Sequence, residues 1–295
     1  MLKNIQGGFS AVDSSTLLKL VPSVLMIGAY TGLAYYIEYM QLHFDLDFKP
    51  TTTVFSLLGI VLGLLLVFRT NTAYERWWEG RRLLGGLTDS SRNLAIKLHA
   101  FLPMADKENR TWFALMIGNY YFAIKEHLRE GVDFNEMEEA YPGMNEELKR
   151  FTHIPNRINA QIMTRINDLA KKGVFTQEQM IIMDNQDSVF TQVIGGCERI
   201  KGTPIPTSYS KHLDRFMLLY TLMLPFGLMH DLGWYTVPVI MIVYFALEGI
   251  KIIGEEIEDP FGRDANDLKT DLLATRVRAN VKEILLPPGY NELHP

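Results

Sequence analysis

The sequence predicts an all-α integral membrane protein with four membrane-spanning helices and a cytosolic helical domain inserted between the second and third spans. The strongest observation is the stretch 50–68, which contains no charged residue. As a helix it is roughly 28 Å long, close to the thickness of a bilayer's hydrocarbon core. Arginines and tryptophans follow directly at 69–82, a pattern typical of a cytoplasmic membrane boundary. The other apolar residues also come in blocks, at 17–39 and 216–247.

Composition excludes some classes of protein and leaves others open. The 295 residues are 47% hydrophobic and 21% charged, with a net charge of −5. A negative chain without a basic, aromatic-rich face argues against nucleic acid as a partner. Cys197 is the only cysteine, so an intramolecular disulfide is impossible, and we expect a small buried residue there. The seven histidines show no metal-ligand spacing.

The first two spans occupy 17–68, after a short N-terminal segment, 1–16, expected on the cytoplasmic side. The block 17–39 is too long for the apolar region of a signal peptide. The connection near 40–50 is acidic, whereas the chain after Phe68 is strongly basic. The positive-inside rule therefore places the connection outside and the following chain inside.

The stretch 69–215 contains no run long enough to cross a membrane, and we interpret it as the cytosolic domain. Its apolar residues recur at helical spacing. An acidic connector is expected at 136–155, followed by helices at 158–169 and 177–193.

The third and fourth spans are predicted at 216–247, as two short apolar runs separated by His230 and Asp231. They fit a tight hairpin whose tip is outside, which leaves both termini cytoplasmic in a cell-membrane protein. The tail, 248–295, is expected to be cytosolic and to contain an amphipathic helix with one packed apolar face.

An apolar ridge lies in the second span. Ile60, Leu64 and Phe68 are four residues apart and share a helix face, and Gly59 with Gly63 makes a small-residue pair beside them. From spacing alone, a lipid-facing ridge beside a helix-packing groove is the simpler interpretation. In an oligomer arranged around an axis, the same ridge would form a hydrophobic constriction that gates by dewetting.

A proline-containing link is predicted at 195–209. Pro204 and Pro206 remove backbone donors and disfavour helical geometry before them, so no helix is expected to continue through this stretch. An ordinary link between helices is the simplest interpretation.

Three segments together resemble the bestrophins, which are pentameric ion channels. They are NTAYERWWEGRR at 71–82, CERIKGTPIPTSY at 197–209 and EDPFGRD at 258–264. Their order and spacing also match, so the resemblance covers roughly 17–285, and it is greatest to the bacterial and plant branch.

The resemblance implies a homopentamer around a central pore. It places the pore neck on Ile60, Leu64 and Phe68, and a cytosolic aperture on Ile205 between the two prolines. It therefore favours the pore-facing interpretation of the ridge. The middle neck position is Leu64 rather than an aromatic residue.

The resemblance is weakest at a calcium site. Animal bestrophins hold calcium in an acidic clasp that the N-terminus helps to form. Asp264 and Asp267 stand at matching positions, but Arg263 and Ala265 interrupt the acidic run. Asp267 as a cap of the last helix is the alternative. No cofactor is expected to be required.

The resemblance implies passive conduction of monovalent ions through the bilayer, with chloride favoured. A monovalent-cation channel of the same fold is the alternative that the net charge of −5 supports. A non-conducting membrane scaffold also stays open. A membrane-bound enzyme would use Glu255 and Glu256, but no histidine partner, nucleophile or phosphate loop accompanies them. We interpret these residues and Glu258 as a solvated acidic surface, and expect no enzyme.

Overall fold

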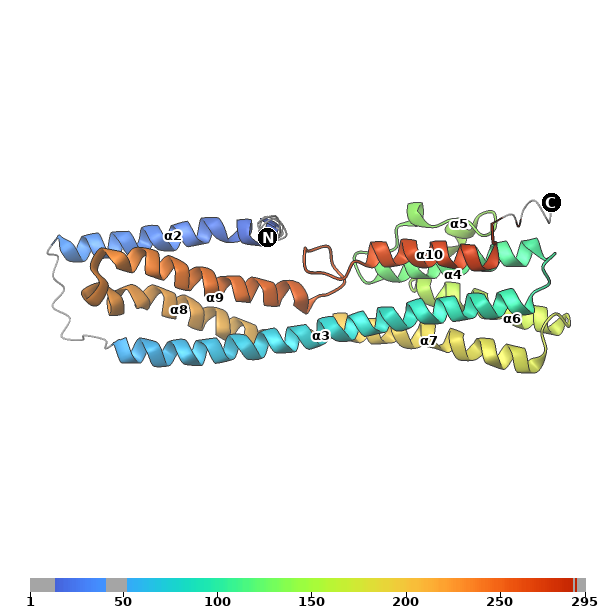
Figure 1. The fold of residues 1–295 in the computed structure, drawn as a ribbon, viewed down its shortest axis with the longest axis horizontal. Coiled ribbons are helices and arrows are strands. Elements are labelled where there is room, and N and C mark those ends of the chain that lie inside the picture. The colour runs from blue at the N-terminus through green and yellow to red at the C-terminus, as the bar shows by residue number, and fades with distance from the viewer. Residues whose placement is uncertain (1–13, 41–51, 289, 291–295) are drawn as a thin grey trace, which may run out of the picture. The chain divides into compact units, whose positions relative to one another are not determined.

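The computed structural model describes residues 14–40, 52–288 and 290, and every regular element in these ranges is a helix (Figure 1). The predicted segment 1–16 up to residue 13, and nearly all of the predicted loop 40–50, lie outside the described residues. The chain divides into two compact units. The apolar unit comprises Met1–Trp77 with Pro204–Asp267, and the polar unit comprises Trp78–Thr203 with Leu268–Pro295.

The apolar unit contains the helices that can cross a membrane. They are α2 (Ser14–Tyr39), the first part of α3 (Thr52–Phe101), α8 (Thr207–Leu232) and α9 (Thr236–Glu258). By length and composition, 3 runs of the described chain qualify as spans: Leu18–Tyr39, Thr52–Phe101 and Thr207–Glu258. The last run contains both α8 and α9, joined by the short 3-10 helix η3 (Gly233–Tyr235).

The turn between α8 and α9 lies slightly later than predicted. His230 and Asp231 are still helical, and the chain reverses at Gly233, whose φ of 55° favours glycine. His230 and Asp231 predicted the region of the turn correctly. The turn itself is at Gly233, because glycine can adopt this left-handed backbone conformation. α9 then continues to Glu258, beyond the predicted end at 247.

Packing in the apolar unit covers one face of α3. α2 packs along α9, and α9 packs along α8. Leu62 and Leu66 of α3 form a buried cluster with Leu213 and Met217 of α8. The opposite face of this part of α3 is therefore left for other contacts.

The polar unit is a helical bundle with a tightly packed core. It contains the second part of α3, α4 (Lys107–His127), α6 (Ile154–Lys171), α7 (Gln177–Gly202) and α10 (Thr270–Leu285), with the short η2 (Phe134–Glu136) and α5 (Met144–Leu148). α4 packs against α10 and α6, and α6 against α7. The fully buried Tyr120 donates a hydrogen bond to the carbonyl of Phe190 at 2.7 Å.

Two predicted boundaries in the polar unit were wrong. α7 does not end at 193 but continues to Gly202, so the irregular link is only 203–206. Gly196 lies inside the helix and is a packing residue: an added Cβ would lie 2.8 Å from the side chain of Leu83. Pro204 acts only on the residue before it, which is where the helix stops. The connector 136–155 also holds α5 and the start of α6.

The buried Cys197 and most of the final apolar face agree with the sequence. Burial raises the pKa of the Cys197 thiol to about 12, so it is not a reactive thiolate. In α10, Val277, Val281 and Leu285 form the fully buried apolar face, whereas Leu272 of the same helix is exposed.

Candidate ion-conducting site

The predicted neck residues lie on one uncovered face of α3. Within the described residues of the single chain, Ile60, Leu64 and Phe68 are 70%, 54% and 58% exposed. Leu62 and Leu66 on the other face are almost completely buried against α8. The ridge is thus a continuous apolar surface, available to lipid or to other copies of the chain.

The two glycines beside the ridge have different surroundings. An added Cβ at Gly59 would lie 2.7 Å from the hydroxyl of Tyr220 on α8, whereas at Gly63 it would meet nothing within 4 Å among the described residues. Gly59 therefore permits the close approach of α3 and α8. Gly63 leaves open space beside the ridge.

A buried arginine follows the ridge directly. Arg69 is only 5% exposed, and its guanidinium lies 3.3 Å from the carboxylate of Glu255 and 3.5 Å from that of Glu258. Glu256 is also buried and pairs with Lys19 at 3.0 Å. The interpretation as a solvated acidic surface was wrong for Glu256 and Glu258, which are the acidic halves of ion pairs between helices. Glu255 is exposed as expected, although it also pairs with Arg69.

The predicted aperture residue is held by the same acidic cluster. The backbone N–H of Ile205 donates to Oε1 of Glu258 at 2.9 Å, while the other carboxylate oxygen faces Arg69. Arg76 of α3 also donates to the backbone carbonyl of Glu258 at 3.0 Å. Among the described residues of the single chain, Ile205 is only 8% exposed. Ile205 is thus buried, unlike the neck ridge.

Sequence reasoning missed the role of Glu258. It is the last residue of α9 and the first residue of the family-like segment EDPFGRD. One signal in the sequence could have revealed the ion pair of Glu258 with Arg69. Arg69 directly follows one predicted apolar span, and Glu258 stands at the end of an apolar helix.

Asp264 and Asp267 lie together in the turn after α9. Oδ2 of Asp267 accepts from the backbone N–H of Asp264 at 2.6 Å. The prediction that Asp267 caps the final helix was wrong, because Lys269 occupies the N-cap position of α10 and makes no side-chain cap. Asp267 instead closes its own turn, and burial raises its pKa to about 6.

These two side chains alone fit calcium poorly. Calcium takes six to eight oxygen ligands. The ammonium of Lys19 lies 3.3 Å from the carboxylate of Asp264 and already balances its negative charge, as a bound cation would. One oxygen of Asp267, Oδ1, is buried without a hydrogen-bond partner among the described residues and is the one feature that suits a cation. The part of the N-terminus before residue 14 lies outside the described residues.

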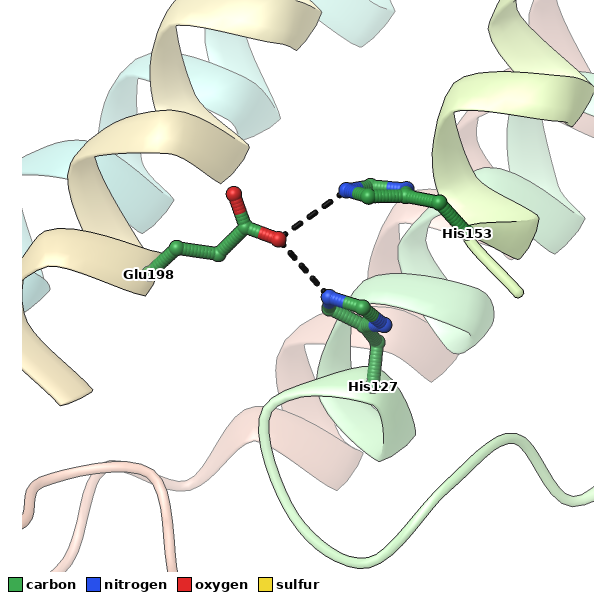
Figure 2. Close-up of side chains that lie close together, drawn as sticks. All are labelled: His127, His153 and Glu198. Atoms are coloured by element: carbon green, nitrogen blue, oxygen red, sulfur yellow. Dashed lines mark hydrogen bonds and ion pairs between the residues drawn. The ribbon is translucent and has the colours of Figure 1, made fainter. Parts of the chain in front are cut away.

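A second cluster, which the sequence did not predict, lies in the polar unit. His127, His153 and Glu198 come from three separate segments and converge in space (Figure 2). No motif spacing could reveal them, because 26 and 45 residues separate their positions along the chain.

The fold and the uncovered apolar ridge define an all-helical integral membrane protein. Residues 3–283 match the family described as Bacterial/Fungal Bestrophin protein, and the chain belongs to this family. The resemblance inferred from the three sequence segments is therefore confirmed.

Relatives and solved structures agree with this assignment. The chain is 36% identical over 242 residues to a voltage-dependent anion channel-forming protein of Synechocystis, which covers 80% of this chain and 78% of the relative. It is 35% identical over 230 residues to a protein of the same description from Nostoc, covering 77% and 75%. A bacterial bestrophin homologue from Klebsiella pneumoniae has the same fold, with a TM-score of 0.83, 27% identity and coverage of 90% and 98%.

Proposed function

We propose that the protein is an anion channel that passes monovalent anions such as chloride across a membrane. The observation that carries the proposal is the similarity to two proteins named as voltage-dependent anion channel-forming, over about three quarters of each chain. Passive conduction needs a pore rather than a catalytic centre, which agrees with membership of the bestrophin family.

The proposed pore forms between subunits. The ridge of Ile60, Leu64 and Phe68 is apolar and uncovered in one subunit, which supports a role at an interface or an axis. With five copies, the number that the bestrophin resemblance implies, each residue becomes a ring of five side chains. Apolar rings exclude water from a narrow passage, so an ion crosses only when they widen.

The proposed arrangement in the membrane has four spans. α2 and the first part of α3 provide two, and α8 with α9 provides a hairpin with η3 at its outer tip. The basic residues that follow the ridge support a cytoplasmic location for that end of α3 and for both termini.

Ile205 is the proposed cytosolic aperture. Its hydrogen bond to Glu258, and the ion pair of Glu258 with Arg69, give the link a fixed attachment to α9 and α3. Arg69 directly follows Phe68, the last residue of the ridge. The contacts of Glu258 therefore connect the proposed aperture to the end of the ridge. Calcium at Asp264 and Asp267 is not needed for any step of this proposal.

Anion flux from proteoliposomes tests the proposal. Purified full-length protein is reconstituted into chloride-loaded vesicles, and chloride efflux is followed after a potassium ionophore removes the charge imbalance. We expect efflux that scales with the amount of protein. In matched vesicles with a proton ionophore in place of the potassium ionophore, efflux of potassium without chloride would replace the proposal by the cation-channel alternative, which the net charge of −5 supports. The absence of both fluxes from well-folded oligomers would favour a non-conducting scaffold.

A further inference from the structure

We propose that His127, His153 and Glu198 form a binding site for a divalent transition-metal ion of the zinc class. Oε1 of Glu198 lies 2.8 Å from Nε2 of His127 and 2.9 Å from Nε2 of His153. The three candidate ligand atoms all lie within 4.8 Å of one another. Figure 2 shows the two imidazoles and the carboxylate directed at a common point.

The ends of three helices position these side chains. His127 is the last residue of α4, His153 is the N-cap of α6, and Glu198 lies near the end of α7. Lys201 of α7 donates to the backbone carbonyls of Leu128 and Arg129, just beyond α4. This contact keeps the ends of α4 and α7 together, so His127 and Glu198 are held close whether or not an ion is bound.

The donor set selects the class of ion. Two imidazole nitrogens and one carboxylate oxygen are ligands that zinc and neighbouring transition metals accept, whereas calcium and magnesium prefer oxygen alone. Zinc lies about 2.0–2.2 Å from such atoms, so tetrahedral ligands lie about 3.3 Å apart. The present spacings of 2.8 and 2.9 Å need only a small outward movement of the side chains. All three side chains are partly exposed, so an ion can enter and water can fill the fourth position.

The hydrogen bonds within the cluster also define what metal binding must change. Nδ1 of His153 accepts from the backbone N–H of Asn156 at 3.2 Å, so a neutral ring carries its proton on Nε2 and donates it to Glu198. A metal ion needs the lone pair of Nε2, so the proton moves to Nδ1 and this cap hydrogen bond is lost. The metal ion thus replaces hydrogen bonds in holding together α4, α6 and α7.

Metal titration of the purified full-length protein tests the site. After chelator treatment and dialysis, Co²⁺ is added and the visible absorption of tetrahedral cobalt is measured, followed by displacement with Zn²⁺. We expect one ion per chain, and a loss of affinity of at least about tenfold in H127Q, H153Q and E198Q. H212Q and E178Q change the same residue types outside the cluster and should bind as the wild type does.

Thermal unfolding supplies a second measurement. Because a ligand that binds the folded state stabilises it, zinc should raise the Tm of the wild type and chelator should reverse the increase. Variants that fold but show no zinc-dependent increase support the site. No binding by the wild type, or equal binding by the three variants, would overturn it. If the variants do not fold, X-ray absorption of the zinc-loaded wild type decides: two imidazole ligands support the site, and a shell without imidazole contradicts it.

Discussion

The carboxylate of Glu258 accepts a hydrogen bond from the backbone N–H of Ile205 at 2.9 Å. Its second oxygen lies 3.5 Å from the buried guanidinium of Arg69. One side chain at the end of α9 therefore joins the link 203–206 to the residue that directly follows Phe68 in α3.

Removal of Glu258 should destabilise the apolar unit. In E258A, the N–H of Ile205 loses its acceptor, and Arg69 keeps only Glu255 among the carboxylates of the described residues, so we expect a loss of about 1–3 kcal/mol. E258Q keeps an acceptor oxygen for Ile205 and should lose less. Thermal unfolding in detergent, followed by size-exclusion chromatography, ranks the stabilities of the wild type, E258Q and E258A. E255Q is the control, because Glu255 is more exposed and does not contact Ile205. An E258A protein as stable as the wild type would contradict this role.

Enlargement of the proposed neck should increase conductance. The triple change I60A, L64A and F68A widens each apolar ring and makes it easier to wet, so single-channel recording should show a several-fold larger current.

The matched control for the neck is an exposed ridge on α8. Leu219, Met223 and Phe226 are also large, apolar and exposed, and the triple change L219A, M223A and F226A should leave the current unchanged. Equal effects of the two triple changes would contradict a pore neck at Ile60, Leu64 and Phe68.

The two glycines of α3 should respond differently to alanine. G59A brings a methyl group against the hydroxyl of Tyr220 and should cost about 1–3 kcal/mol, whereas G63A has no such contact in the subunit. The double change G59A and Y220F removes the hydroxyl and should restore most of the stability. Equal melting of G59A and G63A would argue against close packing at Gly59.

Asp187 should make the polar unit less stable as pH rises. Burial raises its pKa to about 7, against about 3.9 in an unfolded chain. The folded state then binds the proton more tightly, so the stabilising contribution is complete below pH 3.9 and is lost as pH rises towards 7.

The change D187N should remove this dependence. The amide keeps an acceptor for Asn159, which now donates to Asp187 at 3.0 Å, without a buried charge. Melting at pH 5 and pH 8 should show a higher Tm for the variant at pH 8, with a gain below about 4 kcal/mol. D184N changes an exposed aspartate on the same helix and should keep most of the decrease in stability between pH 5 and pH 8. If D187N lost as much stability between pH 5 and pH 8 as the wild type, a group other than Asp187 would be the cause of the pH dependence.

The sequence was most informative where a single helix sets the pattern. Charge-free length predicted the span in α3, and a four-residue period placed Ile60, Leu64 and Phe68 on one face. The same reasoning could not say what covers that face, because lipid and a pore axis select the same apolar residues. The family resemblance supplied the interpretation that the period alone could not.

Predictions failed where distant segments meet. Glu256 and Glu258 looked like surface charges because their partners, Lys19 and Arg69, are far away in the sequence. His127, His153 and Glu198 showed no pattern for the same reason. The helix α7 continues past the predicted end at 193, and Gly196 within it packs against Leu83, a contact between residues far apart in the sequence.

The reversal potential of the reconstituted protein shows whether it conducts anions. The protein is fused into a planar bilayer with a KCl gradient across it, and the voltage of zero current is measured. For an anion channel we expect a reversal near the chloride equilibrium potential. A reversal near the potassium equilibrium potential would contradict anion selectivity, and no current from folded oligomers of either the wild type or the neck variant would contradict the channel itself.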